Sequence, residues 1–144
     1  MAGKAGLRAA ASMLLLLLIC STCTGRPETE SGIFFPTWSA EGDLPLAEVQ
    51  GVLVERDGCL FLTSSGKTLI VWDDEYAFAD GSLIGPSGEP IVRIGETLYG
   101  GGGYYGRAHA ENVSGTSIPD RCAPDNVDAF AVIYGVEAGP FEGV

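Results

Sequence analysis

Basic side chains are scarce in this sequence of 144 residues, which has 8 Lys and Arg against 19 Asp and Glu and a net charge of −11. All the acidic residues follow Cys23, whereas Lys4 and Arg8 precede it, so a chain processed there would carry 6 basic residues and a net charge near −13. Nucleic-acid binding depends on clustered Lys and Arg, and so does attachment to anionic lipid headgroups. The composition therefore argues against nucleic acid as a partner and against a polybasic membrane anchor.

Histidine is equally rare, since His109 is the single copy. A Ser or Cys nucleophile needs a neighbouring base, and no nucleophile motif stands near His109. One His is also a weak basis for a metal site. The run Asp73-Asp74-Glu75 lacks the spaced ligands and the closing Glu of a calcium loop. We therefore predict no catalytic residue, no metal site and no cofactor.

The four glycines Gly100 to Gly103 are followed by Tyr104-Tyr105-Gly106, without the Lys-Ser/Thr pair of a phosphate-binding loop. Glycines after a strand allow a close approach of another backbone or a sharp turn. We expect this structural role for them.

No apolar run is long enough to cross a membrane as a helix, which takes about 20 residues. The apolar stretch from Ala9 to Ile19 has eleven residues and follows Lys4 and Arg8. A basic start, a short apolar stretch and then small polar residues are typical of a secretory signal peptide. We predict that residues 1–23 form this signal.

Cysteine is also rare, and two of the four copies, Cys20 and Cys23, directly follow the leucines. This placement resembles a bacterial lipoprotein signal, in which the cysteine becomes the first mature residue and receives a lipid. Cleavage before Cys23 leaves an even pair, Cys59 and Cys122, and therefore favours Cys23 over Cys20 as the lipidated residue. The lipid would be the only membrane attachment and would hold the protein on the outer side of the cytoplasmic membrane. Ordinary signal cleavage, which would give a secreted protein, remains the alternative.

The stretch from Gly51 to Trp72 predicts three consecutive antiparallel strands. Asp57-Gly58 supplies the two positive-φ positions of a tight hairpin turn, and Ser64-Ser65-Gly66 forms a second turn. The strands Cys59–Thr63 and Thr68–Trp72 are apolar on both faces, so both faces need a cover. We therefore expect this meander to be the middle of a closed or sandwiched sheet.

Further strands are predicted at Ser82–Ile84, Ile91–Ile94, Glu96–Tyr99 and Ala129–Tyr134, with Gly and Pro turns between them and little helical pattern. Five or six short strands indicate an all-β fold, either a small antiparallel OB-like β-barrel or, as the alternative, a small β-sandwich. We place the β-domain at 49–136 and a polar tail at 137–144.

Residues 24–48 have a polar composition and are predicted to be a tether or an N-terminal extension. The apolar segment Ile33–Trp38 interrupts them. We expect this segment to dock on the domain, and the alternative is an exposed aromatic patch that contacts a partner.

Cys59 and Cys122 are predicted to form a disulfide, because export places the chain in an oxidising compartment. The bond would close a loop of just over 60 residues. In the chain-entropy model such a bond stabilises the fold by roughly 4 kcal/mol.

The order of several short features resembles a group of uncharacterised exported bacterial proteins, many of them lipoproteins, common in actinobacteria. These features are Gly51 and Leu53, Gly58-Cys59-Leu60, Ile70-Val71-Trp72, Gly95, a Gly pair within 100–103, and Cys122. The resemblance covers about Val49 to Val136. It implies the disulfide and a small β-domain, and it implies no particular activity.

Three function classes remain open from the sequence. The first is a non-catalytic, membrane-tethered module that binds a partner protein or a small ligand outside the cytoplasm. The second is a structural envelope component without a ligand site. The third is an envelope-directed hydrolase, which the single His and the missing nucleophile motif disfavour.

Overall fold

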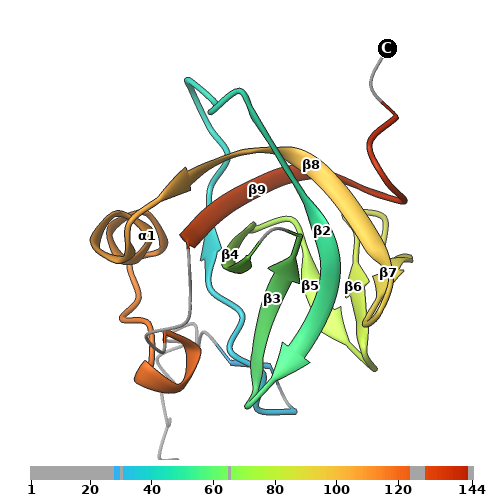
Figure 1. The fold of residues 1–144 in the computed structure, drawn as a ribbon, viewed down its shortest axis with the longest axis horizontal. Coiled ribbons are helices and arrows are strands. Elements are labelled where there is room, and N and C mark those ends of the chain that lie inside the picture. The colour runs from blue at the N-terminus through green and yellow to red at the C-terminus, as the bar shows by residue number, and fades with distance from the viewer. Residues whose placement is uncertain (1–27, 30, 65, 124–128, 143–144) are drawn as a thin grey trace, which may run out of the picture.

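The computed structural model describes residues 28–29, 31–64, 66–123 and 129–142. These residues form one α-helix, one 3-10 helix and nine strands (Figure 1). In chain order the elements are β1 (Thr37–Trp38), β2 (Ala47–Arg56), β3 (Cys59–Thr63), β4 (Lys67–Asp73), β5 (Ala77–Ala79), β6 (Ser82–Ile84), β7 (Pro90–Arg93), β8 (Thr97–Tyr105), α1 (Arg107–Ser114), η1 (Asp120–Cys122) and β9 (Ala129–Ala138).

The predicted meander is confirmed as β2, β3 and β4. The turn between β2 and β3 has φ values of 55° at Asp57 and 73° at Gly58, as a two-residue hairpin turn requires. Val54 then pairs with Phe61, and Phe61 with Leu69, so both pairs of strands are antiparallel.

Two later strands close this meander into a five-stranded barrel. β8 pairs antiparallel with β2, and β9 pairs antiparallel with β8. The circle closes where β9 runs parallel to β4, with Val71 opposite Val132. In Figure 1, β8 and β9 arc across the barrel beside the long curved strand β2. The prediction of a small OB-like barrel is confirmed, and its closing strand pair is parallel.

The segment between β4 and β8 forms a separate three-stranded sheet, β5-β6-β7. Strand β5 was not predicted, because only Phe78 of its three residues is buried and a single buried position gives no alternating pattern. Phe78, Leu83 and Val92 project from this sheet into the same apolar cluster as the barrel interior.

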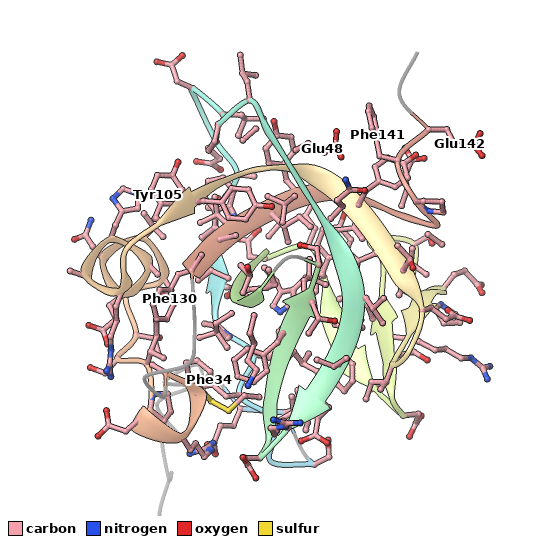
Figure 2. The ribbon with its side chains drawn as sticks, in the orientation of Figure 1. Phe34, Glu48, Tyr105, Phe130, Phe141 and Glu142 are labelled. Carbon is pink, nitrogen blue, oxygen red and sulfur yellow. A yellow bond between two sulfur atoms is a disulfide. The ribbon has the colours of Figure 1, made fainter. Side chains whose placement is uncertain are left out.

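The two apolar faces of β3 and β4 contact two different hydrophobic clusters. Leu60, Leu62, Ile70 and Trp72 point into the barrel interior. The alternate residues pack outside the barrel against α1, η1 and the N-terminal segment, and these are Cys59, Phe61, Leu69 and Val71. Figure 2 shows Phe34 and Phe130 in this outer region, between the barrel and the helical segment. The expectation that both faces need a cover is confirmed.

The eight-residue helix α1 lies between β8 and β9 and departs from the expectation of little helical structure. Only Ala110 of its residues is buried, so its sequence has no apolar stripe of helical period. The helix ends at Gly115, whose φ of 63° is the left-handed conformation that favours glycine.

The segment Ile33–Trp38 docks on the domain, as expected. The backbone N–H of Phe34 donates to the carbonyl of Gly58 at 2.7 Å, and Phe34 is only 1% exposed. The N–H of Trp72 donates to the carbonyl of Pro36 at 2.9 Å, and β1 then pairs in parallel with the end of β4. This part of the predicted tether therefore forms part of the barrel wall.

The barrel strands also extend beyond the predicted range 49–136. β2 begins at Ala47 and β9 ends at Ala138, two residues outside each boundary. Glu48 and Glu137 belong to the backbone ladder although their side chains are polar and exposed. Polar composition alone therefore does not mark these strand ends.

Candidate functional site

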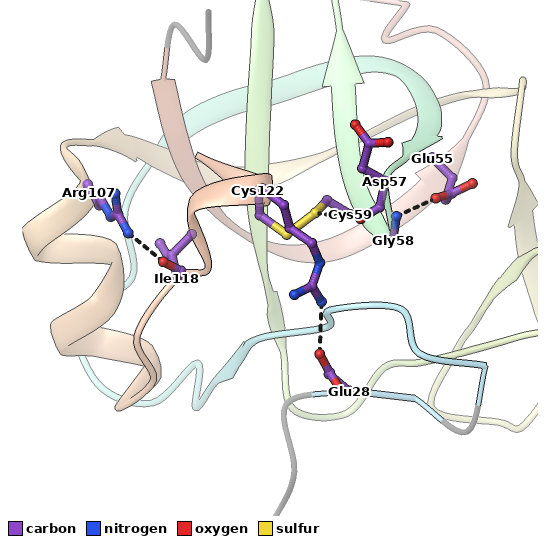
Figure 3. The surroundings of a disulfide bond; sticks show 9 residues. Glu28, Glu55, Asp57, Gly58, Cys59, Arg107, Ile118 and Cys122 are labelled. Atoms are coloured by element: carbon purple, nitrogen blue, oxygen red, sulfur yellow. Dashed lines mark hydrogen bonds and ion pairs between the residues drawn. A yellow bond between two sulfur atoms is a disulfide. The ribbon is translucent and has the colours of Figure 1, made fainter. Parts of the chain in front are cut away.

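The disulfide between Cys59 and Cys122 is present, as predicted, and its Cα atoms are 5.5 Å apart (Figure 3). Cys59 begins β3 and Cys122 ends η1, and neither residue is exposed to solvent. The bond therefore attaches the segment between β8 and β9 to the outer face of the meander.

Polar contacts hold this segment in place beside the disulfide. Arg107 pairs with Glu111 at 3.1 Å and with Asp120 at 3.2 Å, and it also donates to the carbonyl of Ile118. The carboxylate of Glu111 accepts from the N–H of Ile118 at 2.9 Å. This backbone N–H, followed by the Arg107 guanidinium, lowers the pKa of Glu111. Arg121 contacts Glu28 at 2.8 Å, which ties η1 to the N-terminal segment.

A cleft of about 940 Å³ lies beside this N-terminal segment. This volume is within the range of about 300–1,000 Å³ typical of small-ligand sites. Three stretches far apart in the sequence line it: the N-terminal segment, the turn and strand around β5, and the end of α1 with the residues after it. The lining residues are Glu28, Thr29, Ser31, Phe35, Thr37, Tyr76, Ala77, Phe78, Ala79, Asp80, Gly81, Ser114 and Thr116.

Aromatic side chains make the apolar part of the cleft rigid. The ring of Phe35 stacks on Trp72 at a centroid distance of 5.5 Å and on Phe78 at 6.4 Å. The hydroxyl of Tyr76 accepts a hydrogen bond from the N–H of Val136 at 2.8 Å. Since these rings are fixed by the barrel core, the cleft is preformed and does not require a folding step.

Among the described residues that line the cleft, the charged side chains are Glu28, which is paired with Arg121, and Asp80. Hydroxyl groups from five Ser and Thr residues supply the other side-chain polar atoms, apart from the buried Tyr76. The whole stretch between Lys67 and Arg93 has five acidic residues and no Lys or Arg. The cleft therefore suits a cationic or neutral ligand and repels an anionic one.

The single histidine lies away from this cleft, on α1. The ring of His109 stacks on Tyr105 with a centroid distance of 4.1 Å. Neither residue lines the cleft. The structure therefore does not bring His109 together with the hydroxyl groups of the cleft.

The acidic run after β4 has a local structural role. Asp73 is buried, its carboxylate faces the N–H of Glu75 at 3.5 Å, and its backbone carbonyl accepts from the N–H of Tyr76. Burial raises the pKa of Asp73, and the neighbouring carboxylates of Glu75 and Asp74 add to this effect. Within the described ranges, no three His, Cys, Asp or Glu side chains are grouped to hold a metal.

The predicted signal 1–23 and the candidate lipidation residues Cys23 and Cys20 lie outside the described residues. In the described part of the chain no helix has the length and apolar character needed to cross a membrane.

Sequence reasoning did not identify the cleft. Its lining residues come from three segments separated by more than 30 residues each, and hydroxyl and alanine side chains carry no motif. One signal was present, which is the long stretch without basic residues after Lys67.

Comparison of this chain with protein-family models, with curated proteins and with solved structures finds no match.

Proposed function

We propose that the protein is a non-catalytic binding module whose ligand occupies the cleft between the N-terminal segment and β5. The observation that carries this proposal is the preformed cleft of about 940 Å³ with an aromatic floor and the carboxylate of Asp80 in its wall. Buried aromatic contact with a few convergent polar groups is the usual construction of a ligand site. A purely structural envelope component has no need for such a hollow.

The described residues do not assemble a nucleophile with a base, and this supports binding in place of hydrolysis. Both described cysteines are joined in the disulfide, and His109 is stacked on Tyr105 outside the cleft. The hydroxyl of Ser114, one of the cleft residues, donates to the carbonyl of Ala110 at 2.8 Å and so caps its own helix.

The same proposal includes the N-terminal attachment. A lipid on Cys23, or on Cys20 as the alternative, would hold the module on the outer side of the cytoplasmic membrane. The resemblance to exported bacterial lipoproteins supports this placement. Glu28, a residue of the cleft, is five residues after Cys23. Five extended residues span at most about 18 Å, so the cleft would face the membrane region.

Occupation of the cleft by a ligand is tested by site-specific photo-crosslinking in bacterial cells. A benzophenone amino acid replaces Ala77, an exposed residue of the cleft wall, and in a matched control it replaces Gln50, an exposed residue of β2. We expect a discrete adduct from position 77 and none from position 50. The same adduct pattern at both positions, or no adduct at position 77, would contradict the proposal.

The attachment is tested separately by mass spectrometry of the protein from the membrane fraction. We expect a diacylated or triacylated cysteine at the mature N-terminus. An unmodified N-terminus on a protein recovered from the soluble fraction would show that the protein is secreted without a lipid.

A further inference from the structure

Two sheet edges meet the cleft. Among the described strands, β1 is terminal in the order of the large sheet and β5 is terminal in the small sheet. Thr37 of β1 and Phe78 of β5 both line the cleft. A sheet edge presents backbone N–H and C=O groups that can pair with another strand.

The backbone of Thr37 faces away from its only partner strand. The carbonyls of Pro36 and Trp38 accept from the N–H groups of Trp72 and Asp74, at 2.9 and 2.8 Å. Backbone groups alternate in direction along a strand, so the N–H and C=O of Thr37 point to the side opposite β4.

The backbone of Phe78 has the same arrangement at the second edge. The two-residue turn Asp80-Gly81, with φ values of 51° and 72°, joins Ala79 to Ser82 as the hydrogen-bonded pair next to the turn. Phe78 and Leu83 therefore form the non-hydrogen-bonded pair. The N–H and C=O of Phe78 therefore point away from β6, toward the edge of β5 that pairs with no strand of the described residues.

On the basis of the proposed function, we propose that the cleft binds an extended peptide segment carrying Lys or Arg. This peptide adds as a strand to the edge of β5 that faces away from β6. Asp80 provides the charge complementarity, whereas the carboxylate of Glu28 is already paired with Arg121. The edges of β5 and β1 provide the backbone pairing, as in other strand-addition complexes. A strand rises about 3.3 Å per residue, so three-residue β5 accommodates the centre of a peptide of about five residues.

The shortness of the edges explains why the cleft is needed. β5 has three residues and β1 has two, and short edges protect a protein from indiscriminate strand pairing. Backbone pairing at β5 alone is therefore weak. Contact of alternate peptide side chains with Asp80 and with the Phe35 and Phe78 rings supplies the selectivity.

The probe for this proposal is a phage-displayed library of random seven-residue peptides, selected on the full processed protein with its disulfide intact. We expect enrichment of peptides with Lys or Arg at alternate positions. The most enriched synthetic peptide is then titrated into ¹⁵N-labelled protein, and the amides of Thr37 and Phe78 should shift and gain protection from hydrogen exchange. Methylation of alternate peptide backbone nitrogens should abolish binding, because it removes the pairing groups.

Two variants test the edge and the charge. Ala77→Lys places on the edge strand a positive charge that repels the basic peptide, and it should weaken peptide binding at least about tenfold. Gln50→Lys on β2 makes the same change in net charge away from the cleft and should leave the affinity for the peptide unchanged. Asp80→Asn keeps a residue that tolerates the left-handed conformation and should weaken binding about threefold. Circular dichroism and melting temperature identify any variant that fails to fold.

The remaining outcomes distinguish a failure of the peptide proposal from a failure of the proposed function. Enriched peptides that are acidic, that bind Ala77→Lys as well as wild type, or that shift amides away from β5 would overturn the peptide proposal. So would a concentration-dependent dimer that Ala77→Lys abolishes, since a second copy would then occupy the edge. A non-peptide adduct at position 77 in the crosslinking experiment would retain the proposed function and reject the peptide, whereas no adduct would reject the proposed function itself.

Discussion

Gly102 of β8 lies so close to the carbonyl oxygen of Val132 in β9 that a Cβ atom on Gly102 would be 2.0 Å from it. Gly100 has the same relationship with the carbonyl oxygen of Tyr134, at 2.6 Å. The glycine run lies within β8 and not after a strand as expected, and of its two predicted roles it has the first, since it allows β8 to approach β9 closely.

Replacing Gly102 with Ser should destabilise the fold by about 2 kcal/mol or more, because β9 has to move away from the new Cβ. Urea unfolding followed by fluorescence measures the change. Gly106→Ser is the matched control, since a Cβ at Gly106 meets nothing within 4 Å and Ser suits its place at the N-cap of α1. Equal stability of the two variants would refute the close approach.

Removing the disulfide should lower the free energy of unfolding by roughly 4 kcal/mol, because the bond closes a loop with a sequence separation of 63. This corresponds to a fall in melting temperature of roughly 15 to 30 °C. Cys59→Ser and Cys122→Ser should each give this loss, and the double variant no more than either, since one bond is removed in all three. Two free thiols in the freshly isolated protein would contradict the bond.

Phe34→Ala should cost about 3 to 5 kcal/mol, as for other buried aromatic residues, because Phe34 is 1% exposed in the outer cluster. Leu46→Ala is a suitable control, since Leu46 is 93% exposed and its removal leaves no cavity. Calorimetry compares the two. A small effect of Phe34→Ala would mean that the N-terminal segment detaches readily from the barrel in solution.

The buried carboxyl of Asp73 should make the protein less stable as the pH rises through its titration. Its pKa is raised in the folded state by burial, so the folded state binds the proton more tightly than the unfolded state does. The contribution of this group to the free energy of unfolding is therefore greatest at acidic pH and declines between the unfolded and the folded pKa.

Asp73→Asn tests this assignment by removing the titrating group while keeping an oxygen for the N–H of Glu75. The variant should gain stability relative to wild type at pH 7 and lose that advantage at pH 3, where both side chains are uncharged. A constant difference across this range would show that Asp73 does not titrate differently in the two states.

The pairing of neighbouring strands in the meander was predictable because adjacent residues determine it. Asp57-Gly58 specifies the hairpin turn, and the two-faced apolar pattern of Cys59–Thr63 and Thr68–Trp72 predicted a cover on each side. The pairing of Cys59 with Cys122 was predicted because the expected processing and lipidation at Cys23 would leave them as an even pair.

The cleft and the helix were not predictable in this way. Helix α1 depends on tertiary contacts, such as the bond from Arg107 to Ile118, because its own sequence has one buried residue. The cleft forms because the fold brings Thr37, Phe78 and Ser114 together from three separate stretches of the chain. The local sequence around each of these residues does not predict that the other two will lie near it.

The parallel pairing of β9 with β4 sets the time at which the barrel can close. Val132 is 61 residues after its partner Val71, and β9 is the last strand among the described residues. A chain that emerges N-terminus first therefore exposes the edges of β4 and β8 until β9 has been made, and such open edges favour aggregation. A chain truncated after Ala123 keeps both cysteines of the disulfide but lacks β9, and it should be oligomeric and sensitive to protease. A monomeric, protease-resistant product would show that the other barrel strands are stable without β9.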